Sequence, residues 1–223
     1  VCEYIGVTYQ PAFVPQTADR YRYLKKCGIG GIAFNYGNPV NFPKLWWYLH
    51  GKLLWNPEQD AMKLMEDYAP CLYGAAAPHV IAYLKLADAQ YQKTLQSGKK
   101  LANAYPPDFY TPEFLRQACS VLDNAINSLG ITETLRKELT SEKYLMLAAM
   151  KHLPDYNDGE LVRFVLNEGN RCAKQLNRET EFARSNNLVL RELEKTLPPS
   201  RIMALKKQIG TITGAVPEKT AAG

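Results

Sequence analysis

The sequence predicts a mainly α-helical fold with a short α/β start, and two observations support this prediction. Before Asn56, short runs of β-branched and aromatic residues alternate with helical segments, a spacing typical of consecutive βα units. After Asn56, segments with helical periodicity follow one another almost to the end of the chain. The change is abrupt, because an apolar run ends at Trp55 and an acidic amphipathic segment follows. We therefore predict two domains, residues 1–55 and 56–210, and a flexible tail at 211–223.

The α/β start is expected to contain two strand-helix units. We predict strands at 1–9 and 29–35, a helix from about Asp19 to Lys26, and a second helix at 43–55. The strands should be parallel and adjacent, joined by a right-handed crossover through the first helix. Two such units cannot bury both faces of a sheet. Because the chain also begins within a strand pattern, without an initiating methionine or a signal peptide, we expect it to be a piece of a longer protein.

The helix predicted at 43–55 is apolar on nearly every side. A helix of this kind is normally covered on more than one face. We therefore expect it to lie between a barrel or sheet and the helices that follow it. One stripe contains Leu45, Trp46, Leu49 and Leu53, and the other faces carry Trp47, Tyr48, Leu54 and Trp55.

Asn56 and Pro57 are expected to begin the next helix. Asn56 can cap it, Pro57 suits its first turn, and Gln59 can complete a reciprocal capping box. Gly74 should end this helix. Its predicted buried stripe consists of Ala61, Met62, Met65, Tyr68 and Ala69.

The remaining chain is expected to form helices whose lengths differ and which show no repeating period. Prolines and capping residues mark their starts, and glycines mark several of their ends. One predicted helix runs from Pro78 to Gly98, and another runs from Pro112, after a cap at Thr111, to Gly130. Two more begin at Thr132 and Asp158, and shorter helices are predicted at 188–197 and 199–209.

Composition and charge exclude several classes of protein. The net charge of +5 is spread over isolated pairs such as Lys25-Lys26 and Lys206-Lys207, without the basic stripe of a nucleic-acid binder. No apolar run is long enough to span a bilayer. The five cysteines lie far apart without metal-ligand spacing, so we expect free and mostly buried thiols.

Few residues suggest catalysis. His50, His79 and His152 fall on separate helices, and we expect them to be surface or partly buried side chains. The acids after Asn56 are spaced as for solvated helix faces and i,i+4 ion pairs. Up to Asn56 only Glu3 and Asp19 are acidic, and Asp19 suits a helix start. We therefore expect no acid/base pair, no metal site and no cofactor in this chain.

The run from Tyr23 to Leu84 resembles a bacterial family described as domain of unknown function 4838, whose members resemble glycoside hydrolases of the hexosaminidase and α-glucuronidase kind. The motifs that carry the resemblance are Glu3-Tyr4, the GIGG segment at 28–31, LLWNP at 53–57 with Asp60, and LYGAA at 72–76 with Tyr83. Their separation makes the combination more specific than any single motif. The match is good over roughly the first 85 residues and weak beyond them.

The resemblance implies that residues 1–55 are the last two βα units of a (β/α)8 barrel and that an appended helical domain follows. Barrel active sites lie at the C-terminal ends of the strands. Glu3 or Tyr4, and Asn35 or Tyr36, would then form pocket wall and bind carbohydrate, although barrel packing explains them about as well. Catalytic acids would lie upstream in the same protein, which would be periplasmic or extracellular, and this chain alone would be inactive.

A second hypothesis belongs to another class of protein. The chain would then be a noncatalytic helical interaction module whose βα segment docks on a partner protein. Upstream sequence with acids at strand ends would favour the carbohydrate-active barrel over this module. The sequence indicates neither the sugar nor the stereochemical outcome.

Overall fold

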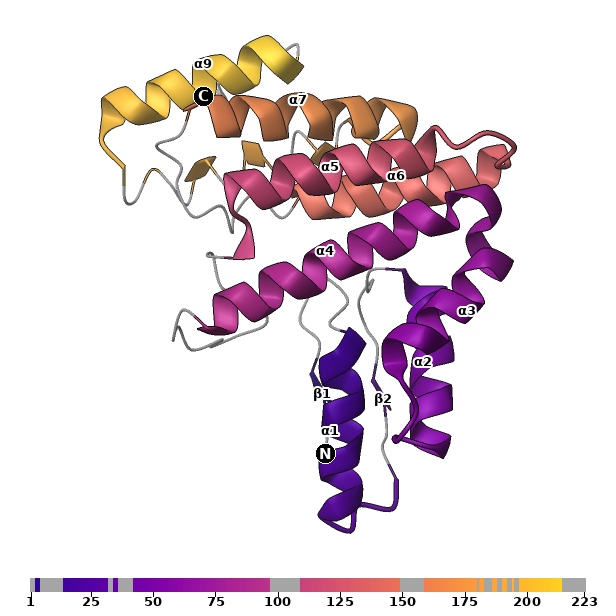
Figure 1. Ribbon diagram of the computed structural model, residues 1–223. Helices are drawn as coiled ribbons and strands as arrows, with labels where there is room; N and C mark the ends of the chain where they lie inside the picture. Colours follow the sequence, from indigo (N-terminus) through magenta and orange to yellow (C-terminus); the bar gives the residue numbers. More distant parts are fainter. Residues whose placement is uncertain are drawn as a thin grey trace. The chain divides into compact units, whose positions relative to one another are not determined.

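A computed structural model of the protein shows a mainly helical chain (Figure 1). The structure describes residues 3–4, 14–31, 34–35, 42–96, 109–148, 159–179, 181–182, 186–187, 190–191, 194 and 197–213. The strands are β1 (Glu3–Tyr4) and β2 (Phe34–Asn35). The helices are α1 (Val14–Lys26), α2 (Pro43–Trp55), α3 (Ala61–Tyr73), the 3-10 turn η1 (Gly74–Ala76), α4 (Ala77–Gln96), α5 (Pro112–Ile126), α6 (Glu133–Ala148), α7 (Gly159–Gln175) and α9 (Pro199–Thr213).

β1 and β2 form a parallel pair. Glu3 lies opposite Phe34 and Tyr4 lies opposite Asn35, and the chain passes through α1 between them. The predicted parallel pairing is therefore confirmed over these two residue pairs. The rest of the predicted strands lies outside the described residues, and the hand of the crossover stays a prediction.

Helix α1 begins earlier than predicted. The prediction of a start near Asp19 was wrong, because the helix begins at Val14. Pro15 falls in the first turn, where its missing N–H has no intrahelical partner to lose. Helical spacing also places Val14, Thr17, Ala18 and Tyr21 on one face, and all four side chains are buried.

Helix α2 has the predicted bounds but only one buried face. Leu45, Leu49, His50 and Leu53 are buried, whereas Trp47 is 51% exposed, Leu54 44% and Trp55 92%. The prediction that this helix is covered on two sides was therefore wrong for this chain. Among the described elements, α1 and α3 pack against α2 and cover the buried stripe.

The predicted cap at Asn56 was also wrong. Asn56 instead ends α2, where its backbone N–H donates to Lys52 O at 2.9 Å. Its side-chain Oδ1 accepts from the Glu58 N–H at 3.1 Å, a local turn that competes with helix initiation. Asp60 caps α3 by accepting from the Lys63 N–H at 3.0 Å.

The other helix signals were largely confirmed. Gly74 ends α3 with a positive φ of 49°. Thr111 accepts from Phe114 N–H and Thr132 from Leu135 N–H, each at 3.2 Å. Helix α5 ends at Ile126 and not at Gly130, while Asp158 lies outside the described residues. In the predicted buried stripe of α3, Ala61, Met65 and Ala69 are buried, whereas Met62 and Tyr68 are half-buried. The Tyr68 ring stacks on the Tyr48 ring, with 3.9 Å between the ring centroids.

The chain divides into two compact units. The first comprises residues 1–142 and 152–154, and the second comprises 143–151 and 155–223. In the first unit α4 packs on α5 and α3, and in the second α7 packs on α9. Helices α2 and α3, on opposite sides of the predicted boundary after residue 55, pack together in the first unit. The predicted division of this chain after residue 55 stays a prediction.

Candidate functional site

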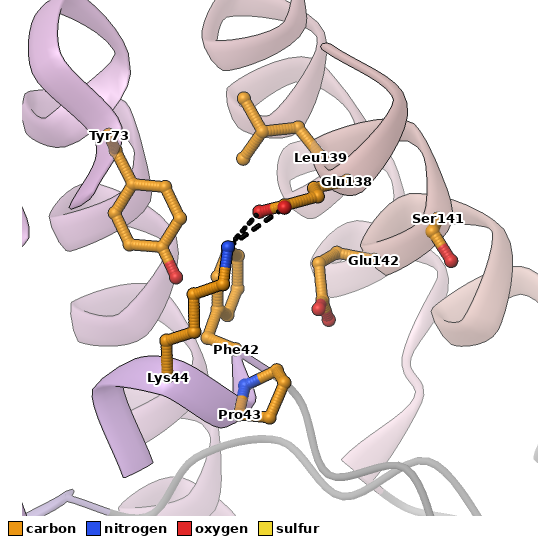
Figure 2. Close-up of a pocket in the computed structure, with 8 residues that line it drawn as sticks. All are labelled: Phe42, Pro43, Lys44, Tyr73, Glu138, Leu139, Ser141 and Glu142. Carbon is orange, nitrogen blue, oxygen red and sulfur yellow. Dashed lines mark hydrogen bonds and ion pairs between the residues drawn. The ribbon is translucent and has the colours of Figure 1, made fainter. Parts of the chain in front are cut away.

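The first unit contains a cavity of 280 Å³ between the start of α2, the end of α3 and one face of α6 (Figure 2). A cavity of this size approaches the volumes of small-molecule sites. Its wall is formed by Phe42, Pro43 and Lys44 from the start of α2, Tyr73 from α3, and Glu138, Leu139, Ser141 and Glu142 from α6.

Phe42 shapes the floor of the cavity in an unusual backbone conformation. It precedes α2 with φ 48° and ψ 58°, a left-handed conformation that costs a bulky residue about 1–3 kcal/mol. Its buried ring packs edge-to-face on Tyr73 at 5.7 Å and lies against Tyr83 at 5.7 Å. Tight packing on both sides holds Phe42 in place, and this conformation directs Pro43 and Lys44 toward the cavity.

Glu138 and Glu142 stand one helical turn apart on the same face of α6. Lys44 Nζ bonds both carboxylate oxygens of Glu138, at 2.8 and 2.9 Å, as Figure 2 shows. The Lys44 side chain is 57% exposed and that of Glu138 is 41% exposed, so the pair contributes at most about 1 kcal/mol to stability. Its main effect is to hold the Lys44 ammonium group and the Glu138 carboxylate together beside the cavity.

Glu142 lacks such a partner. Its Oε2 is buried and makes no hydrogen bond, while the backbone of Phe42 donates a hydrogen bond to the carboxyl group. Burial raises the pKa of Glu142 to about 8, the Phe42 bond opposes that rise, and the Glu138 charge adds to it. At pH 7 the Glu142 carboxyl group therefore carries its proton.

Tyr73 completes the polar wall. Its side chain is buried, and that burial, together with the charges of Glu142 and Glu138, raises its pKa above the usual value. The phenol consequently stays neutral at every pH at which the protein would be studied, and its oxygen can accept a hydrogen bond.

Two carboxyl groups with different protonation states are a common arrangement for acid-base chemistry. Here, however, Lys44 occupies both oxygens of the ionised partner, Glu138, and reduces its capacity to act as a base. The arrangement suits binding of a polar group better than proton transfer. The buried Glu142 also departs from the expectation that the acids after Asn56 lie on solvated helix faces or in i,i+4 ion pairs.

The sequence did contain a signal for this site. Leu135, Leu139 and Met146 recur at helical spacing, and Glu142 occupies a position in the same apolar stripe. Leu139 and Met146 are buried. The periodicity of α6 assigns the position of Glu142 to the core, and an acid at a core position indicates a buried carboxyl group. The i,i+4 spacing of the acids, from which we predicted solvated side chains, does not distinguish buried from exposed positions.

The predicted carbohydrate-binding residues are placed only in part. The parallel pairing sets the backbone of Tyr4 beside that of Asn35, with Glu3 one residue earlier on its strand. Tyr36 lies outside the described residues. Their contact with a sugar stays a prediction.

His50 lies deeper than the surface or partly buried position that we expected. It is buried, its Nδ1 lies 2.5 Å from the Tyr21 hydroxyl, and its ring stacks on Trp46 at 5.0 Å. Burial, with a smaller contribution from the Arg20 charge, lowers its pKa to about 4, so the ring is neutral at pH 7. His79 is half-buried, and His152 lies outside the described residues.

The described cysteines are not joined in disulfides, as predicted. Cys119 and Cys172 are buried, but Cys27 and Cys71 are exposed, so the expectation of mostly buried thiols holds for only half of them. Within the described ranges, no group of three or more His, Cys, Asp or Glu side chains is placed to hold a metal ion. In that same part of the chain, no helix is long and apolar enough to cross a membrane.

Residues 4–85 match a domain of unknown function, DUF4838. The matched segment contains α1, α2, α3 and the first part of α4, but it excludes the α6 residues of the cavity. The predicted resemblance to this family is thereby supported over that segment. No curated protein and no solved structure matches the chain.

Proposed function

We propose that this chain is the C-terminal portion of a glycoside-hydrolase-like, carbohydrate-active protein. In this proposal, β1, α1, β2 and α2 are the last two βα units of a (β/α)8 barrel, and α3 onward form an appended, stabilising helical domain. The observation that carries the proposal is the parallel pairing of Glu3–Tyr4 with Phe34–Asn35 across α1.

A parallel pair with a helical crossover is the building unit of sheets whose two faces are both covered. Two strands alone leave both outer edges unpaired, and proteins rarely leave buried edges in that state. Neighbouring strands from an upstream segment of the same protein would satisfy those edges. The similarity of residues 4–85 to DUF4838 is consistent with a unit that recurs in other proteins.

The exposed face of α2 supports the same proposal. Trp47, Leu54 and Trp55 present large apolar side chains to solvent, although such side chains usually lie in a core or an interface. In a complete barrel, α2 would belong to the outer ring of helices, where neighbouring helices cover a second face.

In the complete barrel, Glu3, Tyr4, Asn35 and Tyr36 would belong to the wall of a carbohydrate pocket, because they stand on or directly after the two strands. Aromatic rings suit the apolar face of a sugar. Glycoside hydrolysis normally needs two carboxyl groups flanking the bond that is cleaved. Glu3 is the only acid among these four residues, so the catalytic acids are expected upstream.

The test compares residues 1–223 with the longer product of the same gene against a panel of aryl glycosides that includes hexosaminides and glucuronides. We expect turnover by the longer protein and none by the isolated chain. Turnover by the isolated chain that disappears in Glu3→Gln would overturn the proposal. Glu142→Gln serves as a control, because it changes an acid of the helical cavity and leaves the proposed pocket wall intact.

The exposed apolar residues of α2 also favour the second hypothesis, a noncatalytic module that docks on a partner protein through this face. The same comparison separates the two functions. A longer protein without barrel strands upstream, and without turnover on any glycoside, would favour the docking module.

A further inference from the structure

The cavity of Figure 2 is lined by Glu142, whose buried Oε2 makes no hydrogen bond. The neighbouring Lys44–Glu138 ion pair indicates that an ammonium group could be its partner. Two carboxyl groups, Glu138 and Glu142, face the cavity from one turn of α6, but Lys44 pairs with Glu138 alone. We propose that the cavity binds a short primary alkylammonium group, with the carboxylate of Glu142 as its charged partner.

The polar wall matches the chemistry of an ammonium group. An ammonium has three donors and no acceptor, so it needs oxygens with free lone pairs. Glu142 Oε2 makes no hydrogen bond, and the neutral Tyr73 hydroxyl lines the same cavity. Lys44 already places one ammonium group on the neighbouring Glu138. A second carboxylate can accept a second ammonium in the same way.

The apolar wall matches an alkyl stem. Phe42, Pro43 and Leu139 line the cavity together with the ring of Tyr73. The 280 Å³ volume lies just below the range of drug-sized sites, which limits the ligand to a small molecule or a single side chain. A free alkylamine and the side chain of a peptide lysine share this chemistry. Because Oε2 is buried, the Glu142 carboxyl group must rotate to expose this oxygen to the ligand on binding.

Binding must compete with the proton on Glu142. The charged or titratable side chains that face Glu142 in the cavity are Glu138, Lys44 and Tyr73, and Lys44 forms an ion pair with Glu138. With a pKa of about 8, Glu142 is ionised to about a tenth at pH 7 and to about nine tenths at pH 9. The apparent affinity scales with the ionised fraction, so it should rise about tenfold over this range. The ligand stays charged, since alkylammonium groups have a pKa near that of lysine, about 10.4.

The experiment titrates the full chain with n-butylammonium by calorimetry and by NMR at pH 6, 7, 8 and 9. We expect affinity to rise about tenfold from pH 7 to pH 9, and binding at pH 7 to release about 0.9 proton per ligand. N-butanol, which has the same stem without the charge, should bind at least tenfold more weakly. N-acetyl-lysine amide tests whether a peptide lysine is also accepted.

Glu142→Gln should abolish n-butylammonium binding while retaining an oxygen for the Phe42 N–H. Asp67→Asn is the matched control, because it removes one exposed acid of α3 and leaves the cavity unchanged. Equal binding by n-butanol, affinity independent of pH, or retained binding in Glu142→Gln would overturn the proposal. If Glu142→Gln fails to fold, the wild-type pH profile and proton release decide the question.

Discussion

Replacing Glu142 with glutamine should stabilise the protein by an amount that grows with pH. The pKa of Glu142 is raised from 4.5 to about 8 in the folded state, mainly by burial. A raised folded-state pKa gives a stability contribution that is present below pH 4.5 and is lost as the pH rises toward 8. Glutamine cannot ionise, so the variant avoids this loss while keeping an oxygen near the Phe42 backbone.

The magnitude follows from the difference between the two pKa values. Each pH unit between 4.5 and about 8 removes ~1.4 kcal/mol from the wild-type protein relative to the variant, which sets an upper limit of ~5 kcal/mol. The Glu142 side chain is only partly screened from solvent along its length, although its Oε2 is buried. We therefore expect Glu142→Gln to be more stable by about 2–4 kcal/mol at pH 8 and nearly unchanged at pH 4.5.

Urea unfolding at pH 5, 6, 7 and 8 measures this difference. All three tryptophans, Trp46, Trp47 and Trp55, lie on α2, so intrinsic fluorescence reports on the helix whose start forms part of the cavity. The midpoint of the variant should move away from that of the wild type as the pH rises. A difference that is constant between pH 5 and pH 8 would refute the assignment of a buried, protonated Glu142.

Four further substitutions test the packing and the cap of α3. Trp55→Ala should change the free energy of unfolding by less than about 0.5 kcal/mol, because Trp55 is 92% exposed. Leu49→Ala on the same helix removes a buried side chain and should cost about 2–5 kcal/mol. A large effect of Trp55→Ala in a urea titration would show that this face of α2 is covered in solution. Asp60→Ala should cost about 0.5–2 kcal/mol in the same assay through loss of the α3 cap, and an unchanged midpoint would contradict that role. Gly169→Ala should cost about 1–3 kcal/mol by thermal unfolding, since its Cβ would lie 2.4 Å from the Phe182 ring, and a tolerated alanine would mean that Phe182 moves freely.

The sequence predicted the helices well because caps and prolines act locally. Thr111 and Thr132 bond backbone N–H groups three residues later, which requires no tertiary contact. The errors arose where two local options compete. Asn56 and Asp60 can each cap a helix, and the choice between them depends on the turn that Asn56 forms with Glu58.

Exposure and the cavity could not be predicted in the same way, because both depend on what packs against an element. The apolar pattern of α2 gave no indication that Trp55 would be exposed, since only the neighbours of the helix determine that. The cavity joins Lys44 to Glu138 across 94 positions of sequence. Local patterns carry no information about such a contact, although Glu142 within an apolar stripe marked the position as unusual.

Glu142 has two roles in the structure, and an alanine at that position separates them. The carboxyl group accepts a hydrogen bond from the strained Phe42, which stabilises the fold, and it adds a buried charge at high pH, which destabilises it. Glu142→Ala loses both effects, whereas Glu142→Gln loses only the charge.

At pH 5 the alanine variant should therefore be less stable than the glutamine variant by about 1–3 kcal/mol, the cost of leaving the Phe42 N–H without its partner. At pH 8 relief of the buried charge should offset much of that loss relative to the wild type. Equal stability of the two variants at pH 5, measured by urea unfolding, would mean that the packing of the Phe42 ring alone holds this left-handed residue in place.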